Sequence, residues 1–308
     1  MAARHIKLKK TIQLSVVLPT FNEEDSIAGL LGETLAALDA SKLNYELLVV
    51  DDGSTDGTPA SIHKVAKNHR RLHLIQHPYN KGNGSAIKTG IRAARGASIA
   101  CMDADGQHAP ADLLKLYAYA ADYDLVVGAR KGTYRGARVR NWGNSLFNRL
   151  ASWLTRFPIE DLTSGLRLFS AQAIRRYVEL LPARFSYPTT TTLVFLKAGY
   201  DIKYVPIEVR PRQRGRSKIR VVQDGWRFLV IILKIIVLFE PLQIFLPIAL
   251  FFFMLASGST LYSSLTLERL FIPNSGVLLF SLSVVVFLLG MIAEQVTNLQ
   301  LLASDRDE

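Results

Sequence analysis

The chain has 308 residues, 49% of them hydrophobic, so it is long enough to bury a core in one large domain and to carry an additional segment. Its single cysteine, Cys101, excludes an intramolecular disulfide and fits a reducing compartment. The net charge of +11 is concentrated in residues 130–234, which hold 21 Lys and Arg against 6 Asp and Glu. Such a basic region is typical of a surface that faces nucleic acid or anionic lipid.

The first residues are basic, with Arg4, Lys7, Lys9 and Lys10, and no apolar segment of a signal peptide follows them. We therefore expect no cleavable signal peptide. Residues 1–11 are expected to be flexible, and the folded part to start at residue 12.

From there to about residue 130, short β-branched runs alternate with helical patterns, which is typical of a parallel sheet flanked by helices. The predicted strands span residues 14–18, 46–50, 72–75, 98–102 and 125–127. The predicted helices span residues 25–38, 58–67, 85–94 and 112–121. The connecting loops hold polar residues and glycines, where ligands bind in open α/β sheets. The predicted fold class is therefore α/β.

Two amphipathic segments follow the predicted sheet. Residues 141–157 have one apolar helical face, which fits an ordinary core helix as well as a membrane-surface helix. Residues 219–240 are more apolar and contain Trp226 and Arg227, which suit a membrane interface. We expect a juxtamembrane amphipathic helix there.

Two uncharged apolar stretches, residues 242–262 and 272–293, are each about long enough to cross a hydrocarbon core of ~30 Å. Soluble core helices of this length show a polar stripe, which these stretches lack. Eight Lys and Arg lie between residues 210 and 234, so the positive-inside rule predicts that the preceding domain and the tail at residues 295–308 are cytoplasmic. Anionic lipid headgroups explain a basic segment beside a span better than nucleic acid does. We therefore expect an integral membrane protein that binds no nucleic acid.

Three predicted strands end in loops that carry carboxylates: residues 19–24 (PTFNEE), 51–57 (DDGSTDG) and 103–108 (DADGQH). Each loop is also compatible with an ordinary turn, because Asp, Asn, Ser and Gly are favoured in turns for backbone reasons. Asp56 in particular fits a cap of the helix predicted to begin at Thr58.

The third loop is the most specific of the three. Asp103 and Asp105 repel each other unless a cation lies beside them. Mg²⁺ and Mn²⁺ prefer such oxygen ligands together with phosphate oxygens, and Gln107 supplies a further oxygen. His108 is adjacent but is not needed for this site.

A glycine-rich segment, residues 80–84 (NKGNG), opens the predicted helix 85–94 and can present backbone N–H groups and Lys81 to an anion. It lacks the spacing of a P-loop, which excludes a P-loop kinase as a motif match. A dinucleotide-binding glycine motif after the first strand is also absent, which disfavours a dinucleotide oxidoreductase.

The motifs LPTFNEE, VVDDGSTDGT, NKGNG and MDADGQH, followed by VGAR, LTSGLRLF and RPRQRGRSK, occur in this order within about residues 12–220. Together they resemble the inverting family-two glycosyltransferases of GT-A fold, in the branch of dolichol-phosphate mannose synthases and polyprenyl-phosphate glucosyltransferases. Single motifs are weak, whereas the ordered set is specific. The resemblance implies a GT-A catalytic domain at residues 12–218 and, as in some members, a transmembrane hairpin within residues 241–294.

The resemblance also implies roles for individual residues. Those expected to line the nucleotide-sugar pocket are Pro19, Phe21, Glu23, Asp52 and Asp103, with Lys81 as a further candidate. Those expected to hold Mg²⁺ or Mn²⁺ are Asp105, Gln107 and Asp103. Those expected around the donor diphosphate and the acceptor phosphate are Arg130, Arg138, Arg212, Ser217 and Lys218, with Arg135 and Arg140 as well spaced as Arg138. The groups expected to act in catalysis are Asp105, Arg130 and Arg212.

The implied reaction is transfer of a hexose from UDP-glucose or GDP-mannose to a polyprenyl or dolichyl phosphate. The second pKa of a phosphate monoester is ~6, so the acceptor is already a dianionic nucleophile at neutral pH and needs no general base. The enzyme has to position the substrates and place positive charge on the leaving diphosphate, which a metal and arginines supply. We expect a single displacement with inversion at the anomeric carbon.

Two alternatives stay open at this point. A processive polysaccharide synthase of the same fold is disfavoured by the low number of spans and by residues 223–227 (QDGWR), which differ from the expected product-binding motif. A non-catalytic membrane scaffold that binds nucleotide is disfavoured by the intact pair Asp103 and Asp105. The sugar, the lipid length and the oligomeric state stay undetermined, with a homo-oligomer joined through the spans as one expectation.

Overall fold

The computed structural model describes residues 11–130, 148–149, 152, 157–183, 186–210, 230, 233, 237 and 239–306. The chain divides into two compact units, Met1–Phe228 and Leu229–Glu308. The first unit contains the sheet and the second contains the apolar helices. Most residues of the predicted amphipathic helices at 141–157 and 219–240 lie outside the described residues, so both helices stay predictions.

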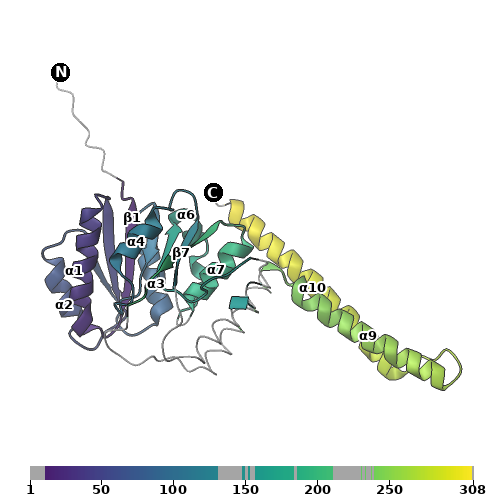
Figure 1. The fold of residues 1–308 in the computed structure, drawn as a ribbon. Coiled ribbons are helices and arrows are strands. Elements are labelled where there is room, and N and C mark those ends of the chain that lie inside the picture. Colours follow the sequence, from purple (N-terminus) through teal and green to yellow (C-terminus); the bar gives the residue numbers. More distant parts are fainter. Residues whose placement is uncertain are drawn as a thin grey trace. The chain divides into compact units, whose positions relative to one another are not determined.

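The first unit is built on a seven-stranded sheet in the order β3-β2-β1-β4-β6-β5-β7 (Figure 1). Its strands are β1 (Leu14–Thr20), β2 (Tyr45–Asp51), β3 (Leu72–Gln76), β4 (Ser98–Cys101), β5 (Leu125–Arg130), β6 (Arg167–Ser170) and β7 (Ile202–Ile207). Only β6, which pairs with β4 and β5, runs antiparallel in this sheet. Every residue of β1 and β2 is buried, as expected of strands covered on both faces.

Helices cover both faces of the sheet. Because successive side chains of a strand point to opposite faces, Val16 and Leu18 join one core cluster and Val17 faces the other side. The cluster side is covered by α1 (Glu24–Ala40), α2 (Thr58–Ala66) and α4 (Pro110–Tyr117). The opposite side is covered by α3 (Asn83–Ala93), whose Gly90 lies against Val17 so closely that a Cβ there would be 2.2 Å from Val17 Cγ1.

The α/β fold class and the predicted positions of the first five strands are confirmed, with ends that differ by at most three residues. The later elements were not predicted from the sequence. These are β6, β7, α6 (Ala171–Arg176), the short 3₁₀ helix η1 (Val178–Leu180) and α7 (Tyr187–Lys197). Four consecutive threonines in α7 are buried, and β-branched residues do not indicate a helix, so the pattern gave no clear signal there.

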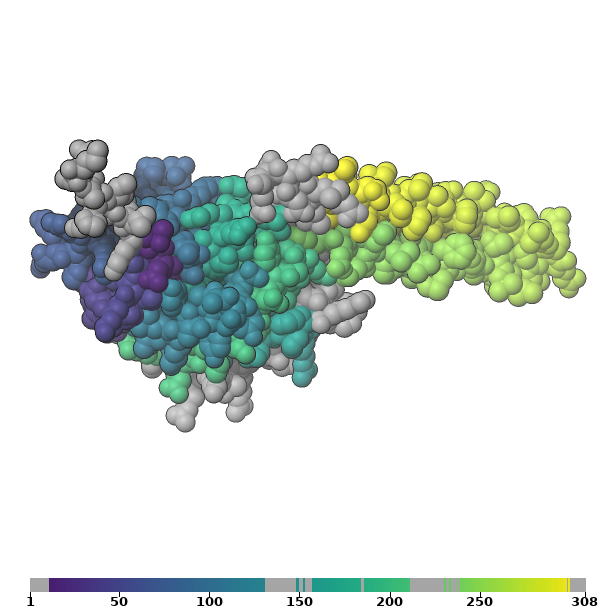
Figure 2. All heavy atoms as spheres, turned by 90° about the horizontal axis from the view of Figure 1, so that it is seen from above, coloured from purple at the N-terminus to yellow at the C-terminus, as the bar shows by residue number. Residues whose placement is uncertain are grey.

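The second unit is a hairpin of α9 (Leu242–Thr266) and α10 (Asn274–Arg306), which pack side by side (Figure 2). Within it, Leu242–Thr266 and Asn274–Thr297 are long and apolar enough to cross a membrane. Small residues let the helices approach: Gly290 lies against Phe245, and Ser283 Oγ donates to the carbonyl of Ala249 at 2.8 Å. At 25 residues α9 rises about 37 Å, which exceeds a hydrocarbon core of ~30 Å.

Candidate active site

The loops that follow the parallel strands meet at one edge of the sheet. Asp52, directly after β2, donates its backbone N–H to Thr20 at the end of β1, at 2.9 Å. Met102, directly after β4, donates to Val17 of β1 at 3.1 Å. The carboxyl ends of β1, β2 and β4 are therefore neighbours, and the polar loops predicted from the sequence lie together.

The first two loops are joined by hydrogen bonds. Asn22 donates its N–H to Ser54 Oγ and accepts from the N–H of Thr55, both at 2.9 Å. Glu23 donates its N–H to Thr58 Oγ1 at 2.8 Å. These contacts hold residues 21–24 against the start of α2, with Pro19 buried at the end of β1 and Phe21 and Glu23 half-buried.

Asp56 contacts the first residue of α2, as the capping interpretation expected. Its Oδ1 accepts from the N–H of Thr58 at 3.0 Å and also from the hydroxyl of Thr58. Burial raises the pKa of Asp56, but the hydrogen bonds from Thr58 outweigh it, so the net pKa is lowered.

Asp52 is almost fully buried and holds the glycine-rich loop. Its Oδ1 accepts from the N–H of Lys81 at 3.0 Å, and its Oδ2 accepts from the N–H of Gly82 at 2.7 Å. His77 Nδ1 lies 2.7 Å from the same Oδ1. The structure thus ties Asp52 to the backbone of residues 81–82, and its contact with a nucleotide stays a prediction.

The third loop, residues 103–107, begins directly after β4 and Met102. Gly106 has a φ of 71°, a left-handed conformation that favours glycine, and turns the chain there. Asp105 Oδ1 accepts from the N–H of Gln107 at 3.1 Å. Asp103, Asp105 and Gln107 are all half-buried, so the loop offers two carboxylates and an amide at a partly open position.

Gly165 approaches the first of these carboxylates. A Cβ at Gly165 would lie 1.9 Å from Asp103 Oδ2, so only a glycine leaves room for that carboxylate. The described residues contain no group of three or more His, Cys, Asp and Glu side chains that could hold a metal. The donor set of two carboxylates and an amide still fits a hard divalent cation, which commonly takes one or two carboxylates and completes its shell with phosphate oxygens.

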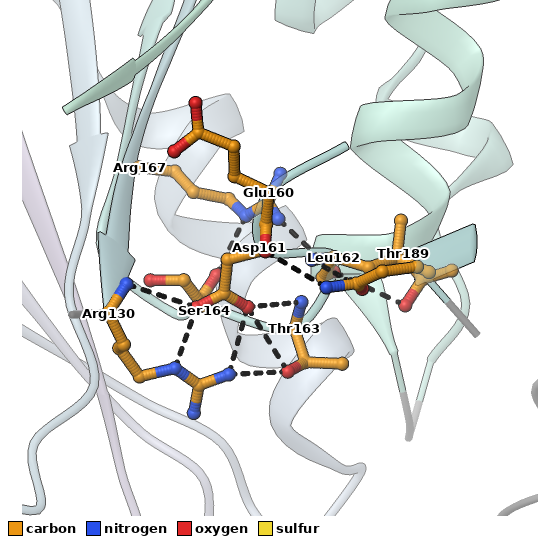
Figure 3. Close-up of polar contacts among 9 residues, drawn as sticks. Arg130, Glu160, Asp161, Leu162, Thr163, Ser164, Arg167 and Thr189 are labelled. Carbon is orange, nitrogen blue, oxygen red and sulfur yellow. Dashed lines mark hydrogen bonds and ion pairs between the residues drawn. The ribbon is translucent and has the colours of Figure 1, made fainter. Parts of the chain in front are cut away.

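Arg130 lies at the end of β5 and pairs with Asp161 (Figure 3). Its Nε donates to Oδ2 at 2.7 Å and its Nη2 to Oδ1 at 2.9 Å, which is a bidentate ion pair. Nη2 also donates to Thr163 Oγ1 at 2.5 Å. Burial raises the pKa of Asp161, but Arg130 outweighs it and the net pKa is lowered.

Arg167 of β6 is fully buried and contacts the segment that carries Asp161 (Figure 3). Arg167 donates to the carbonyls of Ser164 at 2.8 Å and Leu162 at 3.3 Å. Its Nη1 donates to the hydroxyls of Thr191 at 3.2 Å and Thr192 at 2.7 Å. One guanidinium thus joins residues 162–164 to α7.

His108 directly follows Gln107 in the sequence and is buried. It is 5% exposed, and its Nδ1 has no hydrogen-bond partner among the described residues. Its pKa is lowered chiefly by burial, with further electrostatic effects from Asp105, Arg130 and Asp161. Because β4 and β5 both pair antiparallel with β6, they run in the same direction, so Arg130 at the end of β5 lies at the same sheet edge as the third loop.

Comparison with known proteins identifies the family of the chain. The family model described as glycosyl transferase family 2 matches residues 15–178, and the model described as GtrB C-terminal hairpin matches residues 240–299. The chain belongs to glycosyl transferase family 2. The family expected from the sequence motifs is thereby confirmed, and the protein is a glycosyltransferase.

Several relatives of this family 2 glycosyltransferase are known from sequence. An uncharacterised glycosyltransferase of Synechocystis sp. is 28% identical over 300 residues, which cover 93% of this chain and 92% of the relative. The polyprenol monophosphomannose synthase of Mycolicibacterium smegmatis is 30% identical over 224 residues, covering 68% and 82%. The dodecaprenyl-phosphate galacturonate synthase of Rhizobium johnstonii is 33% identical over 170 residues, covering 54% and 50%.

Solved structures share the fold of this glycosyltransferase. The glucosyl-3-phosphoglycerate synthase of Mycobacterium tuberculosis, in complex with Mn²⁺, UDP and glucosyl-3-phosphoglycerate, aligns with a TM-score of 0.58 at 20% identity. The alignment covers 72% of this chain and 79% of that structure. At this identity the likeness supports the predicted GT-A fold.

The structure shows residues that contact or support the predicted site residues and that sequence reasoning missed. Asp161, Thr163 and Arg167 lie in or beside the motif LTSGLRLF, which was noted without roles for its members. Asp161 is one of only 6 acidic residues in the basic region 130–234, which is a signal that could have drawn attention to it. His77 carried no recognisable signal, because its partners Asp52 and Thr89 are distant in sequence.

The remaining predicted phosphate-binding residues, Arg138, Arg212, Ser217 and Lys218, lie outside the described residues. The last described residue before three of them is Arg210. Its N–H donates to the carbonyl of Gln107 at 2.9 Å, and its Nη1 lies 2.8 Å from Glu33 Oε2. The basic segment therefore starts beside the third loop.

Proposed function

We propose that this glycosyltransferase moves a hexose from a nucleoside diphosphate sugar to a polyprenyl or dolichyl phosphate, with inversion and with a divalent metal, at the cytoplasmic face of a membrane. The observation that carries the proposal is that the Asp103–Asp105 loop after β4, Arg130 at the end of β5 and the start of the basic segment at Arg210 lie at one edge of the sheet. The acceptor is supported by the names of relatives, which include a polyprenol monophosphomannose synthase and a dodecaprenyl-phosphate galacturonate synthase.

The nucleotide is proposed to lie over the ends of β1, β2 and β4. Pro19, Phe21 and Glu23 border this region from one loop, and Asp52 with Lys81 borders it from another. Asp52 contributes by fixing the backbone around Lys81. Lys81 is half-buried, and its Nζ lies 5.6 Å from the ring centre of Tyr79, so a cation is available beside an aromatic ring.

The metal site proposed is Asp105 and Gln107 with Asp103. When bound there, Mg²⁺ or Mn²⁺ would supply positive charge to the leaving diphosphate. The half-buried carboxylates and the room left by Gly165 next to Asp103 fit this role. That structural relatives hold Mn²⁺ or Mg²⁺ with UDP is consistent with it.

Arginines are proposed to complete the phosphate sites. The planar guanidinium of Arg130 matches a phosphate as well as a carboxylate. It can therefore bind the donor diphosphate either in place of Asp161 or while it keeps one of its hydrogen bonds to Asp161. Arg210, two residues before Arg212, donates its N–H to the carbonyl of Gln107 in the third loop, and Arg212 is proposed to contact the phosphates at this site. Ser217, Lys218 and Arg138 are proposed to hold the acceptor phosphate with it.

The acceptor phosphate needs little chemical activation. Its dianion at neutral pH is the nucleophile, so no side chain has to remove a proton. Bond formation to the anomeric carbon accompanies departure of the nucleoside diphosphate, whose developing charge is met by the arginines. A single displacement of this kind inverts the anomeric configuration.

The hairpin is proposed to anchor the enzyme where its lipid acceptor lies. The helices α9 and α10 span the membrane in this view, and the basic segment at 210–234 contacts anionic headgroups on the cytoplasmic side.

A donor screen tests the function. The full chain in detergent is incubated with Mn²⁺ or Mg²⁺, undecaprenyl or dolichyl phosphate, and UDP-glucose or GDP-mannose, and the lipid product is read by mass. We expect one hexose added per lipid phosphate. A polymeric product would favour a processive synthase, and nucleotide binding with no turnover across a wider donor panel would favour a non-catalytic scaffold.

A further inference from the structure

The loop between β3 and α3, residues 78–82, has its shape set by the neighbouring turn at Asp52 and Gly53. The carboxylate of Asp52 accepts two of its backbone N–H groups, those of Lys81 and Gly82. Gly53 has a φ of 73°, and a Cβ there would lie 2.5 Å from the carbonyl carbon of Tyr79. The two segments are therefore in direct contact, and the loop position depends on how the Asp52 side chain is oriented.

His77 is the side chain that orients Asp52. It directly follows β3, and its backbone N–H donates to the carbonyl of Asp51 at 2.8 Å. Its Nδ1 lies 2.7 Å from Asp52 Oδ1, and its Nε2 lies 2.9 Å from Thr89 Oγ1 on α3. The side chains of His77 and Asp52 are only 6% and 4% exposed, so this chain of contacts is shielded from water.

The roles of the ring nitrogens follow from these partners. A carboxylate only accepts, so Nδ1 carries a hydrogen and donates to Asp52. The hydroxyl of Thr89 can donate or accept, so it satisfies Nε2 in either protonation state. The ring is thereby held at both ends, between α3 and the turn after β2.

We propose that His77 is a positioning residue for donor binding. By holding Asp52 it fixes the N–H groups of Lys81 and Gly82, and so the loop that presents Lys81 to the nucleotide. This rests on the proposed function, in which Lys81 borders the nucleotide. A histidine that merely fills the core would affect stability without changing nucleotide affinity.

Two substitutions separate these roles, because each keeps one of the two ring contacts. In His77→Asn the amide nitrogen takes approximately the place of Nδ1, so the bond to Asp52 is kept and that to Thr89 is lost. In His77→Gln the longer amide reaches the place of Nε2, so the bond to Thr89 is kept and that to Asp52 is lost. Both variants remove the aromatic ring from the same buried position.

The measurements are UDP and GDP affinity in the presence of Mn²⁺, and donor KM and kcat, on the full chain in detergent. We expect His77→Gln to weaken binding of the preferred nucleotide and to raise the donor KM about tenfold, because a charge-assisted hydrogen bond is lost. Its kcat should stay within about twofold, as for lost uniform binding. His77→Asn should stay within about threefold of the wild type in both affinity and KM.

Hydrogen–deuterium exchange over residues 78–84 gives a readout independent of nucleotide. Exchange should rise in His77→Gln and stay near the wild-type level in His77→Asn. If His77→Gln does not fold, His77→Phe keeps a ring at this position without the bond to Asp52, and faster exchange with a raised KM is expected there. Thr89→Val is its control, because it loses only the contact that His77→Asn also loses and should stay near the wild type. Equal affinities and equal exchange in the two His77 variants would overturn the positioning role. If the wild-type protein binds neither UDP nor GDP, that result would contradict the proposed function rather than the role of His77.

Discussion

Arg130 donates two parallel hydrogen bonds to the carboxylate of Asp161, from Nε to Oδ2 at 2.7 Å and from Nη2 to Oδ1 at 2.9 Å. Both side chains are largely buried, at 28% and 10% exposed. The pair lies at the carboxyl end of β5, at the same sheet edge as the third loop. The arginine proposed to contact the donor is therefore also part of a buried ion pair that stabilises the domain.

This pair should make stability depend on pH. The pKa of Asp161 is lowered in the folded protein, so its contribution is fully present above the ordinary aspartate pKa of ~3.9 and is lost as pH falls through the lowered value. Asp161→Asn should cost about 3 kcal/mol of unfolding free energy at pH 7. The difference from wild type should shrink below about pH 4. Thermal melts at both pH values check this, with Glu179→Gln at an exposed pair as the control. A difference independent of pH would contradict the assignment.

The metal proposal predicts that Asp105→Ala lowers kcat by about 10³-fold, because loss of a ligand removes charge stabilisation of the leaving diphosphate. EDTA should abolish wild-type turnover, and added Mn²⁺ or Mg²⁺ should restore it. Asp122→Ala, at an exposed carboxylate outside the loop, is the matched control. Undiminished turnover in EDTA would refute metal dependence.

Gly165 lies against the carboxylate of Asp103, so a substitution at Gly165 should weaken metal binding at the proposed site. In Gly165→Ala the new Cβ would overlap Asp103 Oδ2, so this carboxylate has to move. We expect about tenfold more Mn²⁺ for half-maximal activity, equivalent to ~1.4 kcal/mol of binding free energy. Gly32→Ala is the control, because nothing lies within 4 Å of its Cβ position in α1. Equal metal requirements in both variants would show that Asp103 is not a ligand.

The basic segment predicts unequal effects among its arginines. If Arg212 pairs with a phosphate in a shielded site, Arg212→Ala should lower turnover by ~10²-fold, and Arg212→Lys should stay poor because lysine lacks the fork. Arg216→Ala should be mild. Donor turnover in detergent with excess lipid phosphate measures all three. Equal, mild losses would leave only a role in membrane contact.

The hairpin predicts firm membrane association. A chain ending at Glu240 should still bind anionic vesicles through residues 210–239, but more weakly, and salt should release it. The full chain should stay in the membrane pellet at high salt. A reporter fused after residue 308 should be cytoplasmic. A truncated chain that resists salt as well as the full one would show that α9 and α10 are not the main anchor.

Local patterns were sufficient for the first half of the fold. The β-branched runs and the polar loops after them predicted β1 to β5 and the grouping of Asp52, Asp103 and Asp105 at one sheet edge, because parallel strands bring their carboxyl ends together. They did not predict β6, whose four residues pair antiparallel between β4 and β5. A short strand carries little periodicity, and its direction depends on partners that are remote along the chain.

By itself the sequence determined the α/β class, the family, the two apolar spans and the carboxylate loop, because each depends on composition or on neighbouring residues. Only the tertiary structure decided that Asp161 pairs with Arg130, that Gly165 makes room for Asp103 and that His77 holds Asp52. The two residues of each pair are between 25 and 62 positions apart in the sequence. A contact of that kind exists only once the sheet has brought the strand ends together, and no local propensity encodes it.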